Sequence, residues 1–364
     1  MAEVYVDQDA SGANDGTSEA DAYTDPVSAL GVTAGDTLHI AKATADYAIS
    51  TPLQFTGAGS ITSLVVIIGY NTSFVIDGSR PVIDAGSTHA YCFRLDAAQD
   101  YFHIYNIEMK NATTHGITGA TTTTGCVLVN IWTHDCTATG INGFQYSRFI
   151  NCISSANALG IKTPANGGFV LYCLVYDNSG IGIDINSNIA AVVSNCLIYD
   201  NGGIGLDTNH MTYVKNTVCH GNTGDNINVF SNNSVIDACR ITLSGGYGID
   251  GGATSQNTFV LNTYIPNTGE ALANTSGATN GVLHTLANAS LDLNDLVGTD
   301  LDGGYTDSTI DDYNTLSTAS VYNGSIDMGD GVNFTYATAG LVPTASGGGG
   351  GGGGGALIDG DLVQ

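Results

Sequence analysis

Residues 191–230 read AVVSNCLIYDNGGIGLDTNHMTYVKNTVCHGNTGDNINVF, and one pattern occurs twice within them. Val193 and Asn195 of the first copy correspond to Val214 and Asn216 of the second, 21 residues later. The pattern recurs every 21 to 24 residues at eight anchor positions: Asn106, Asn130, Asn151, Tyr172, Asn195, Asn216, Ala238 and Asn262. A fixed period of this length indicates one structural unit stacked on its own copies.

Each repeat has the character of short strands. Apolar runs alternate with a period of two, as at Ile181, Ile183 and Ile185, and Gly, Asn, Ser or Thr residues bound them. About 22 residues are too few for a strand, a helix and two loops. We therefore expect an all-β chain, in which each coil has three short strands and the stacked coils form parallel sheets.

The anchor positions predict a corner between two strands. Inward apolar residues such as Val193, Cys196 and Ile198 flank Asn195 at an interval of three, which a continuous strand with period two cannot produce. Asn tolerates the left-handed backbone conformation that such a bend requires. A second column of asparagines predicts another turn, with hydrogen bonds from coil to coil: Asn157, Asn178, Asn201 and Asn222.

The repeats resemble those of right-handed parallel β-helix proteins, the pectate-lyase-like superfamily, over about residues 3 to 290. The first residues also resemble the entry segment of that superfamily: Val4–Asp7, Gly12, Asn14–Thr17 and Ala34–Leu38. There the chain forms one strand, a capping helix and the first coil. Asp25 would be the N-cap of that helix, Pro26 its first residue and Gly31 its end. The superfamily includes lyases, hydrolases, isomerases and virion parts, so the resemblance implies the fold and leaves the activity open.

The sequence predicts four segments. Residues 1–50 would hold the entry strand, helix and first coil, residues 51–290 the β-helix, residues 291–346 the terminal coils or cap, and residues 347–364 a tether with a docking peptide. The tether is a run of nine glycines, Gly347–Gly355. The apolar residues after it could add to a partner as a strand or enter a groove: Leu357, Ile358, Leu362 and Val363.

The charge of the chain limits its partners. Eight Lys and Arg residues stand against 34 Asp and Glu residues, a formal net charge of −26. We therefore expect neither nucleic-acid binding nor membrane insertion, and a divalent cation or a cationic partner surface would be favoured. The start Met1–Glu3 has no signal-peptide character, which predicts synthesis in the cytosol and a place on a virion surface. Secretion is the alternative.

Four of the eight cysteines occupy one position, directly after the anchor: Cys152, Cys173, Cys196 and Cys239, with Thr217 filling the gap. Such a file points inward at about 4.8 Å spacing and does not converge on one metal ion. We expect buried free thiols that pack as small apolar side chains.

One outward column could carry chemistry. It lies one residue after the second recurring apolar position and is called the polar column: Thr118, Asn142, Lys162, Asp184, Asp207, Asn228 and Asp250. If the chain is an enzyme, Lys162, Asp184, Asp207 and Asp250 are its candidate residues. The resemblance implies either lyase chemistry with Ca²⁺ and a Lys or Arg base, or hydrolase chemistry with several Asp. Neither pattern is complete, because Lys162 is expected to be the only base here, and a solvated polar ladder is the alternative.

A second outward set, the apolar stripe, follows the anchors: Trp132, Ile153, Leu174, Leu197 and Val218, with His134, Ser155, Tyr176, Tyr199 and His220 beside it. An exposed stripe over five coils predicts an oligomer interface, a surface covered by the C-terminal segment, or a platform for stacking sugars. The sequence His134–Asp135–Cys136 alone does not establish a catalytic group.

These features favour a structural or adhesive component of a larger assembly, a phage virion protein such as a capsid decoration, tail fibre or tailspike part. The resemblance implies a homotrimer, because virion proteins of this fold are commonly trimers. The tail would contact other assembly proteins, and the β-helix could contact a cell-surface glycan. A polysaccharide lyase or glycoside hydrolase and a non-catalytic glycan-binding module are the alternatives. No cofactor is required, although Ca²⁺ could bind at Asp300, Asp302 and Asp307.

Overall fold

The computed structural model describes residues 2–251 except 56, 97–98, 121, 164–165, 187–189, 210 and 231–233. After residue 251 it describes Thr263, the strands up to residue 287 and three later strands. The chain divides into two compact units, Met1–Thr299 and Asp300–Gln364.

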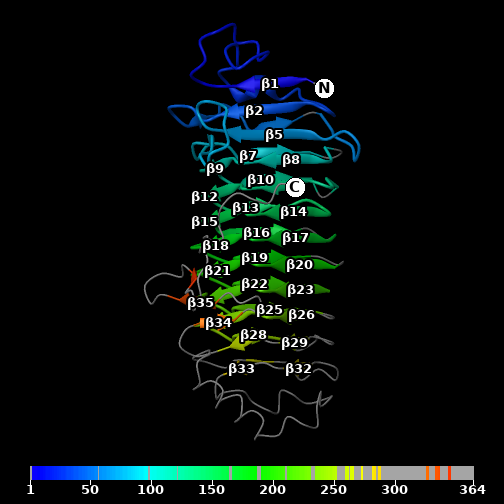
Figure 1. Ribbon diagram of the computed structural model, residues 1–364, viewed down its shortest axis with the longest axis vertical. Coiled ribbons are helices and arrows are strands. Elements are labelled where there is room, and N and C mark those ends of the chain that lie inside the picture. Colours follow the sequence, from blue (N-terminus) through cyan, green and yellow to red (C-terminus); the bar gives the residue numbers. More distant parts are fainter. Residues whose placement is uncertain are drawn as a thin grey trace, which may run out of the picture. The chain divides into compact units, whose positions relative to one another are not determined.

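The first unit is built from three parallel sheets, to which each coil contributes one strand (Figure 1). Sheet A contains β1 (Glu3–Val6), β2 (Thr37–Ala41), β5 (Val65–Tyr70), β8 (Phe102–Tyr105), β11 (Val127–Val129), β14 (Ser147–Ile150), β17 (Gly168–Leu171), β20 (Ala191–Ser194), β23 (Thr212–Lys215), β26 (Val235–Asp237), β29 (Phe259–Leu261) and β32 (Gly281–Leu283). Sheet B contains β3 (Tyr47–Ala48), β6 (Val82–Asp84), β9 (Glu108–Lys110), β12 (Trp132–His134), β15 (Ile153–Ser155), β18 (Leu174–Tyr176), β21 (Leu197–Tyr199), β24 (Val218–His220), β27 (Arg240–Thr242), β30 (Tyr264–Ile265) and β33 (Leu286–Ala287). Sheet C contains β4 (Leu53–Phe55), β7 (Tyr91–Leu95), β10 (His115–Gly119), β13 (Thr139–Asn142), β16 (Leu159–Thr163), β19 (Ile183–Ile185), β22 (Leu206–Thr208), β25 (Ile227–Val229), β28 (Ile249–Asp250) and β31 (Leu272–Ala273). This is a right-handed parallel β-helix, as the repeat predicted.

The anchor residues form the corner between sheets A and B. Asn106, Asn130, Asn151, Asn195 and Asn216 all have positive φ angles, between 48° and 58°. Tyr172 and Ala238 take the same conformation, with φ of 57° and 52°, although neither side chain favours it. The predicted corner is therefore confirmed at every anchor that the structure describes, and the spacing of the repeat determines it even where the residue type does not.

The second asparagine column lies between sheets B and C and is fully buried. The amide nitrogen of Asn178 donates to the side-chain oxygen of Asn201 over 2.9 Å, and Asn201 donates to Asn222 over 2.9 Å. Each side-chain oxygen also accepts the backbone N–H of the asparagine one coil before it. The ladder thus satisfies polar groups that would be costly to bury unpaired, and it confirms the predicted bonds between coils.

The interior is filled by one continuous core. Inward residues of all three sheets, such as Phe149, Ile198 and Ile183, are fully buried. All eight cysteines are buried and free, and those of the file donate to backbone carbonyl oxygens, as Cys173 Sγ does to Phe149 over 3.5 Å. Burial raises the pKa of the Cys173 thiol well above its usual range. The prediction of an inert thiol file is confirmed.

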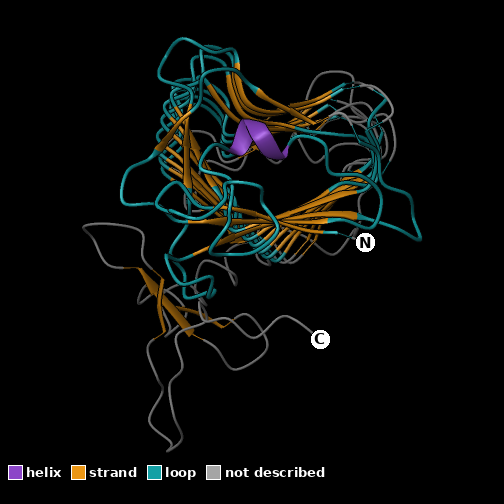
Figure 2. Cartoon of the chain, turned by 90° about the horizontal axis from the view of Figure 1, so that it is seen from above, coloured by secondary structure: helices purple, strands orange, loops and turns teal. Residues whose placement is uncertain are grey.

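The first coils are covered by a single 3₁₀ turn, η1 (Pro26–Ala29), which Figure 2 shows inside the outline of the three sheets when the molecule is seen from above. The Asp25 carboxylate accepts the Val27 N–H over 2.9 Å, so Asp25 is the predicted N-cap. The turn ends at Ala29, before Gly31.

The second unit contributes three antiparallel strands: β34 (Ser325–Asp327), β35 (Asn333–Tyr336) and β36 (Pro343–Ala345). The glycine tether, the docking peptide and the candidate calcium ligands Asp300, Asp302 and Asp307 lie outside the described residues.

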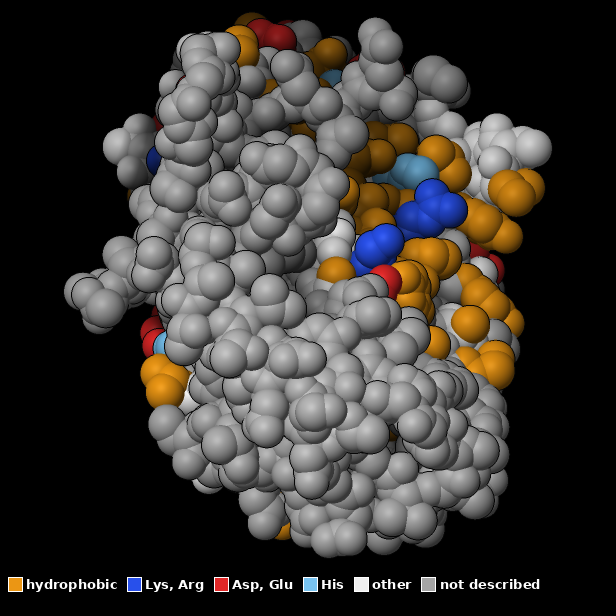
Figure 3. Space-filling model, turned by 60° about the horizontal axis from the view of Figure 1, so that its bottom comes forward, with side chains coloured by type: hydrophobic (Ala, Val, Ile, Leu, Met, Phe, Trp, Pro, Cys, Tyr) orange, Lys and Arg blue, Asp and Glu red, His pale blue; other side chains and the backbone are white. Residues whose placement is uncertain are grey.

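The outward sides of the sheets differ in chemistry. Outward residues of sheet A are largely apolar, those of sheet B combine the apolar stripe with charged groups such as Glu108 and Lys110, and the polar column lies on sheet C. Figure 3 shows hydrophobic side chains gathered beside basic side chains and a histidine on one face. No helix of the described residues is long and apolar enough to cross a membrane.

Candidate functional site

The polar column runs along sheet C in one register. Lys162 pairs with Asp184, Asp184 with Asp207, and Asp207 with Asn228 on successive strands from β16 to β25. The same register continues to Asp250 at one end. At the other end it passes through Thr118 to Arg94 and Gln54. The expectation that Lys162 is the only base in this column is therefore wrong.

In the middle of the column, two residues form an ion pair, and the next residue is a carboxyl group in a more buried environment. Lys162 Nζ lies 2.7 Å from Asp184 Oδ2, and both side chains are partly exposed. The Asp207 carboxyl accepts the Asn228 amide over 3.0 Å. Burial and the neighbouring Asp184 charge raise the pKa of Asp207 to about 6. Two carboxyl groups on adjacent strands thus lie in different environments: Asp184 is paired with a lysine, and Asp207 is protonated in mildly acidic solution.

A neighbouring row of sheet C lies two or three residues before the polar column. Asp225 is partly buried, and burial together with the Asp250 charge raises its pKa. At the other end, the Arg94 guanidinium lies 5.3 Å from the centre of the Tyr91 ring, which stacks on His115 at 5.9 Å. The sequence reasoning missed these four residues. Extending the register upstream would have found Arg94, and counting three residues back along the extended column would have found Tyr91, His115 and Asp225.

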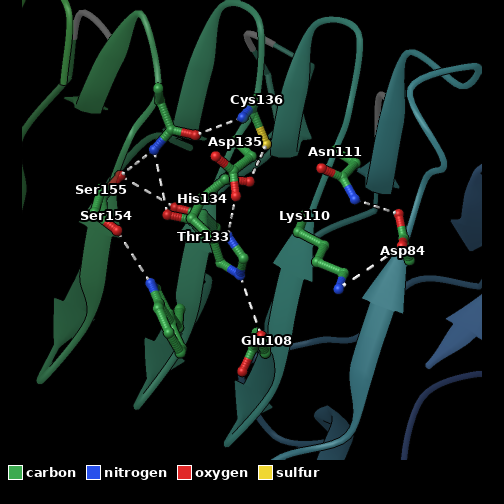
Figure 4. A network of polar contacts seen from close by, with 12 residues as sticks. Asp84, Glu108, Lys110, Asn111, Thr133, His134, Asp135, Cys136, Ser154 and Ser155 are labelled. Atoms are coloured by element: carbon green, nitrogen blue, oxygen red, sulfur yellow. Dashed lines mark hydrogen bonds and ion pairs between the residues drawn. The ribbon is translucent and has the colours of Figure 1, made fainter. Parts of the chain in front are cut away.

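The residues beside the apolar stripe include a hydrogen-bonded cluster on sheet B (Figure 4). His134 Nε2 lies 3.1 Å from Glu108 on β9, and its Nδ1 lies 2.6 Å from the adjoining Asp135. Burial opposes the charged imidazolium, but these two carboxylates prevail and raise the pKa of His134. Cys136 is buried and its Sγ contacts the His134 carbonyl oxygen, so it does not act as a nucleophile toward a surface ligand. Glu108 was not singled out from the sequence.

The apolar stripe itself faces outward and is half-buried. Trp132, Leu174 and Leu197 alternate with the buried Thr133, Val175 and Ile198. In the accompanying row, the Tyr176 and Tyr199 rings stack 5.1 Å apart and nearly parallel, and His220 contacts Thr242 over 2.5 Å. The Trp132 indole donates to Ser155 Oγ over 3.3 Å. The stripe is therefore a continuous surface rather than part of the core.

The described residues contain no group of three or more His, Cys, Asp or Glu side chains arranged to hold a metal ion. Along the polar column, Lys162 precedes the two adjacent carboxyl groups Asp184 and Asp207. Asn228 then separates them from Asp250. Such an array can exchange hydrogen bonds with the hydroxyl groups of a sugar, and it contains one paired and one protonatable carboxyl group.

Comparison with known proteins places the fold. No family model and no curated protein matches the chain. A pectate lyase, Pel9A, superposes with a TM-score of 0.60 and 16% identity, covering 88% of this chain and 85% of the lyase. A rhamnogalacturonan lyase gives a TM-score of 0.61 and 15% identity, covering 86% and 98%. ORF18 of Geobacillus virus E2 gives a TM-score of 0.55 and 11% identity, covering 78% and 61%. The chain has the pectate-lyase-like β-helix fold. Identities this low extend to the fold alone.

Proposed function

We propose that this protein is a structural and adhesive component of a larger assembly, a phage virion protein that acts as a homotrimer. The observation that carries the proposal is the outward apolar stripe, which runs over five successive coils of sheet B and remains half-buried. An exposed apolar surface does not stabilise a monomeric β-helix in water, whereas burial of that surface between subunits stabilises an oligomer. The similar fold of the Geobacillus virus E2 protein supports the same function.

The oligomeric state of the full chain tests this proposal. Sedimentation equilibrium at micromolar concentration should give three times the 37.3 kDa chain mass. A monomer that persists to about 100 µM would contradict it. A second test concerns the tail, for which residues 347–364 remain the proposed attachment to other assembly proteins. Their deletion should abolish incorporation into the particle while the circular dichroism of the β-helix stays unchanged.

A second candidate function is cleavage of a glycan on sheet C, as the two similar lyases suggest. The specific observation in its favour is the pair Asp184 and Asp207, which lie on adjacent strands in contrasting environments. Glycoside hydrolysis uses a pair of carboxyl groups, of which one must be protonated to act as the general acid, and the raised pKa of Asp207 suits that role. Asp184→Asn and Asp207→Asn should each reduce the turnover rate of the true glycan by about 10²-fold or more while leaving the fold intact. Unchanged glycan binding with no product from the unaltered chain would instead identify a binding module.

A further inference from the structure

The outward side of sheet A, called the A face, is free of acidic residues over seven successive strands. From β5 to β23 no strand contains Asp or Glu, in a chain that has 34 of them. Its outward residues are Val66, Ile68, Tyr70, His103, Tyr105, Val127, Val129, Arg148, Ile150, Phe169, Leu171, Val192, Ser194, Tyr213 and Lys215.

Large apolar side chains on and beside the A face remain exposed. Phe169 is 41% exposed, Tyr172 at the corner 49%, and Tyr146 before β14 53%. The only charged groups of the face are basic: the Arg148 guanidinium lies 5.7 Å from the centre of the Phe169 ring, and Lys215 lies three strands further along. The A face thus combines apolar area with positive charge, a composition typical of interface centres.

The outward side of sheet B, called the B face, has the complementary composition. Its centre is the apolar stripe with the stacked pair Tyr176 and Tyr199. Its far edge carries exposed acids, Asp135, Asp177 and Asp200, each with a positive φ where its strand ends. Glu108 adds a further carboxylate.

The two faces meet at one corner, so their edges can be matched. Arg148 lies three residues before the corner residue Asn151, at the far edge of the A face. Asp177 lies five residues after the corner residue Tyr172 of the next coil, at the far edge of the B face. If the corners of several copies gather around a common axis, the basic edge of one copy meets the acidic edge of the next at the same level along the rod.

We propose that the A face of one copy packs on the B face of the next copy, which closes a ring of three with the corner asparagines at its axis. This inference rests on the proposed homotrimer and names its surfaces. Such an interface joins two different patches, and it closes when the rotation between copies returns to the start. Over seven coils each face covers on the order of 400 Å², so one A-to-B interface buries about 800 Å² in total, which is small for a specific interface, and a closed ring contains three of them.

Single-face variants test the proposal. Phe169→Glu changes only the A face and Leu174→Glu only the B face. Each should reduce the sedimentation mass from trimer to monomer at 10 µM, while far-UV circular dichroism shows that the β-helix is intact. Asn142→Glu, on the outward side of sheet C, is the matched control and should remain trimeric.

Mixing the two variants separates this arrangement from a symmetric pairing of like faces. One intact A face and one intact B face remain in an equimolar mixture, so heterodimers of twice the chain mass should form. A mixture that stays monomeric would overturn the packing of A on B. As a second route, Arg148→Glu should dissociate the trimer and the added change Asp177→Arg should restore it at least partly.

The remaining outcomes distinguish this inference from the function on which it rests. If the unaltered protein is trimeric and both single-face variants stay trimeric, the assignment of the faces is wrong and the proposed function stands. If the unaltered protein is monomeric at every concentration, the homotrimer fails and this inference fails with it.

Discussion

Sheets A and C belong to the same coils and have similar inward sides, but their outward sides differ in composition. Inward residues of both are apolar and fully buried, as Phe149 and Ile183 are. On the outward side, sheet A presents Phe169 and Val192 where sheet C presents Lys162 and Asp184. The core therefore constrains one side of each strand, and the other side is free to carry the chemistry of a partner.

Polar residues of sheet C already have partners within their own column. Lys162 pairs with Asp184, Asn228 donates to Asp207, and Asn142 donates to Thr118 over 3.0 Å. Some polar groups of the A face also pair with each other, as His103 and Tyr105 do over 3.2 Å, but its exposed apolar side chains leave water only when a further surface covers them. Sheet C is suited to exchange hydrogen bonds with a soluble or glycan ligand, and sheet A to bury area against protein.

The largest effect expected from this contrast comes from two phenylalanines on neighbouring strands of sheet A. Phe149 faces inward and is fully buried, whereas Phe169 faces outward and is 41% exposed. Phe149→Ala should lower the free energy of unfolding by about 3 to 5 kcal/mol, because it leaves a cavity in the core. Phe169→Ala should change it by less than about 1 kcal/mol in the dissociated chain. Urea unfolding at low protein concentration measures both.

Similar losses of unfolding free energy for the two variants would contradict the contrast between core and surface, because the A face would then be part of the folded core of each chain. A repeat of the measurement at high protein concentration tests whether the A face is an interface. If the A face is an interface, the Phe169→Ala deficit should grow with protein concentration, because association stabilises only the unaltered trimer.

The periodic features of this fold could be predicted from the sequence, and the surface features only in part. Spacing alone placed Tyr172 and Ala238 at left-handed corners, and it oriented the cysteine file and the apolar stripe. The A face was missed because strands such as β5 and β20 are apolar on both sides, which a pattern of alternation cannot separate into inward and outward residues. Glu108 and His134 are 26 residues apart and meet only because their coils stack.

A second, smaller effect concerns pH and sheet C. The pKa of Asp207 is raised to about 6 from its ordinary value of 3.8, so its protonated form stabilises the fold. This contribution is fully present below pH 4 and is lost as the pH rises through 6. Asp207→Asn should therefore stabilise the protein relative to the unaltered chain by about 1 to 2 kcal/mol at pH 7, after allowance for partial exposure, and by almost nothing at pH 4.

Urea unfolding of both proteins at pH 4, 5, 6 and 7 gives this difference directly and cancels the titration of the other carboxyl groups. A difference that is the same at all four pH values would contradict the raised pKa. Glu19→Gln, at an exposed position of the entry segment, is the control.

The smallest effect expected is that of the lysine beside this pair. The Lys162 side chain is 37% exposed, so its ion pair with Asp184 is screened by water and should contribute only about 0.5 kcal/mol to stability. Its charge also lowers the pKa of Asp207, against the opposing effects of burial and Asp184. Lys162→Ala should therefore raise the upper end of the pH range over which stability is lost, which lies at about pH 6, and with it the midpoint of that loss, while changing stability little at pH 4. Asn142→Ala, at the neighbouring position of the polar column, should leave that midpoint in place. An unchanged midpoint in Lys162→Ala would show that the lysine does not act on the carboxyl pair, and sheet C would then be a ladder of independent polar groups.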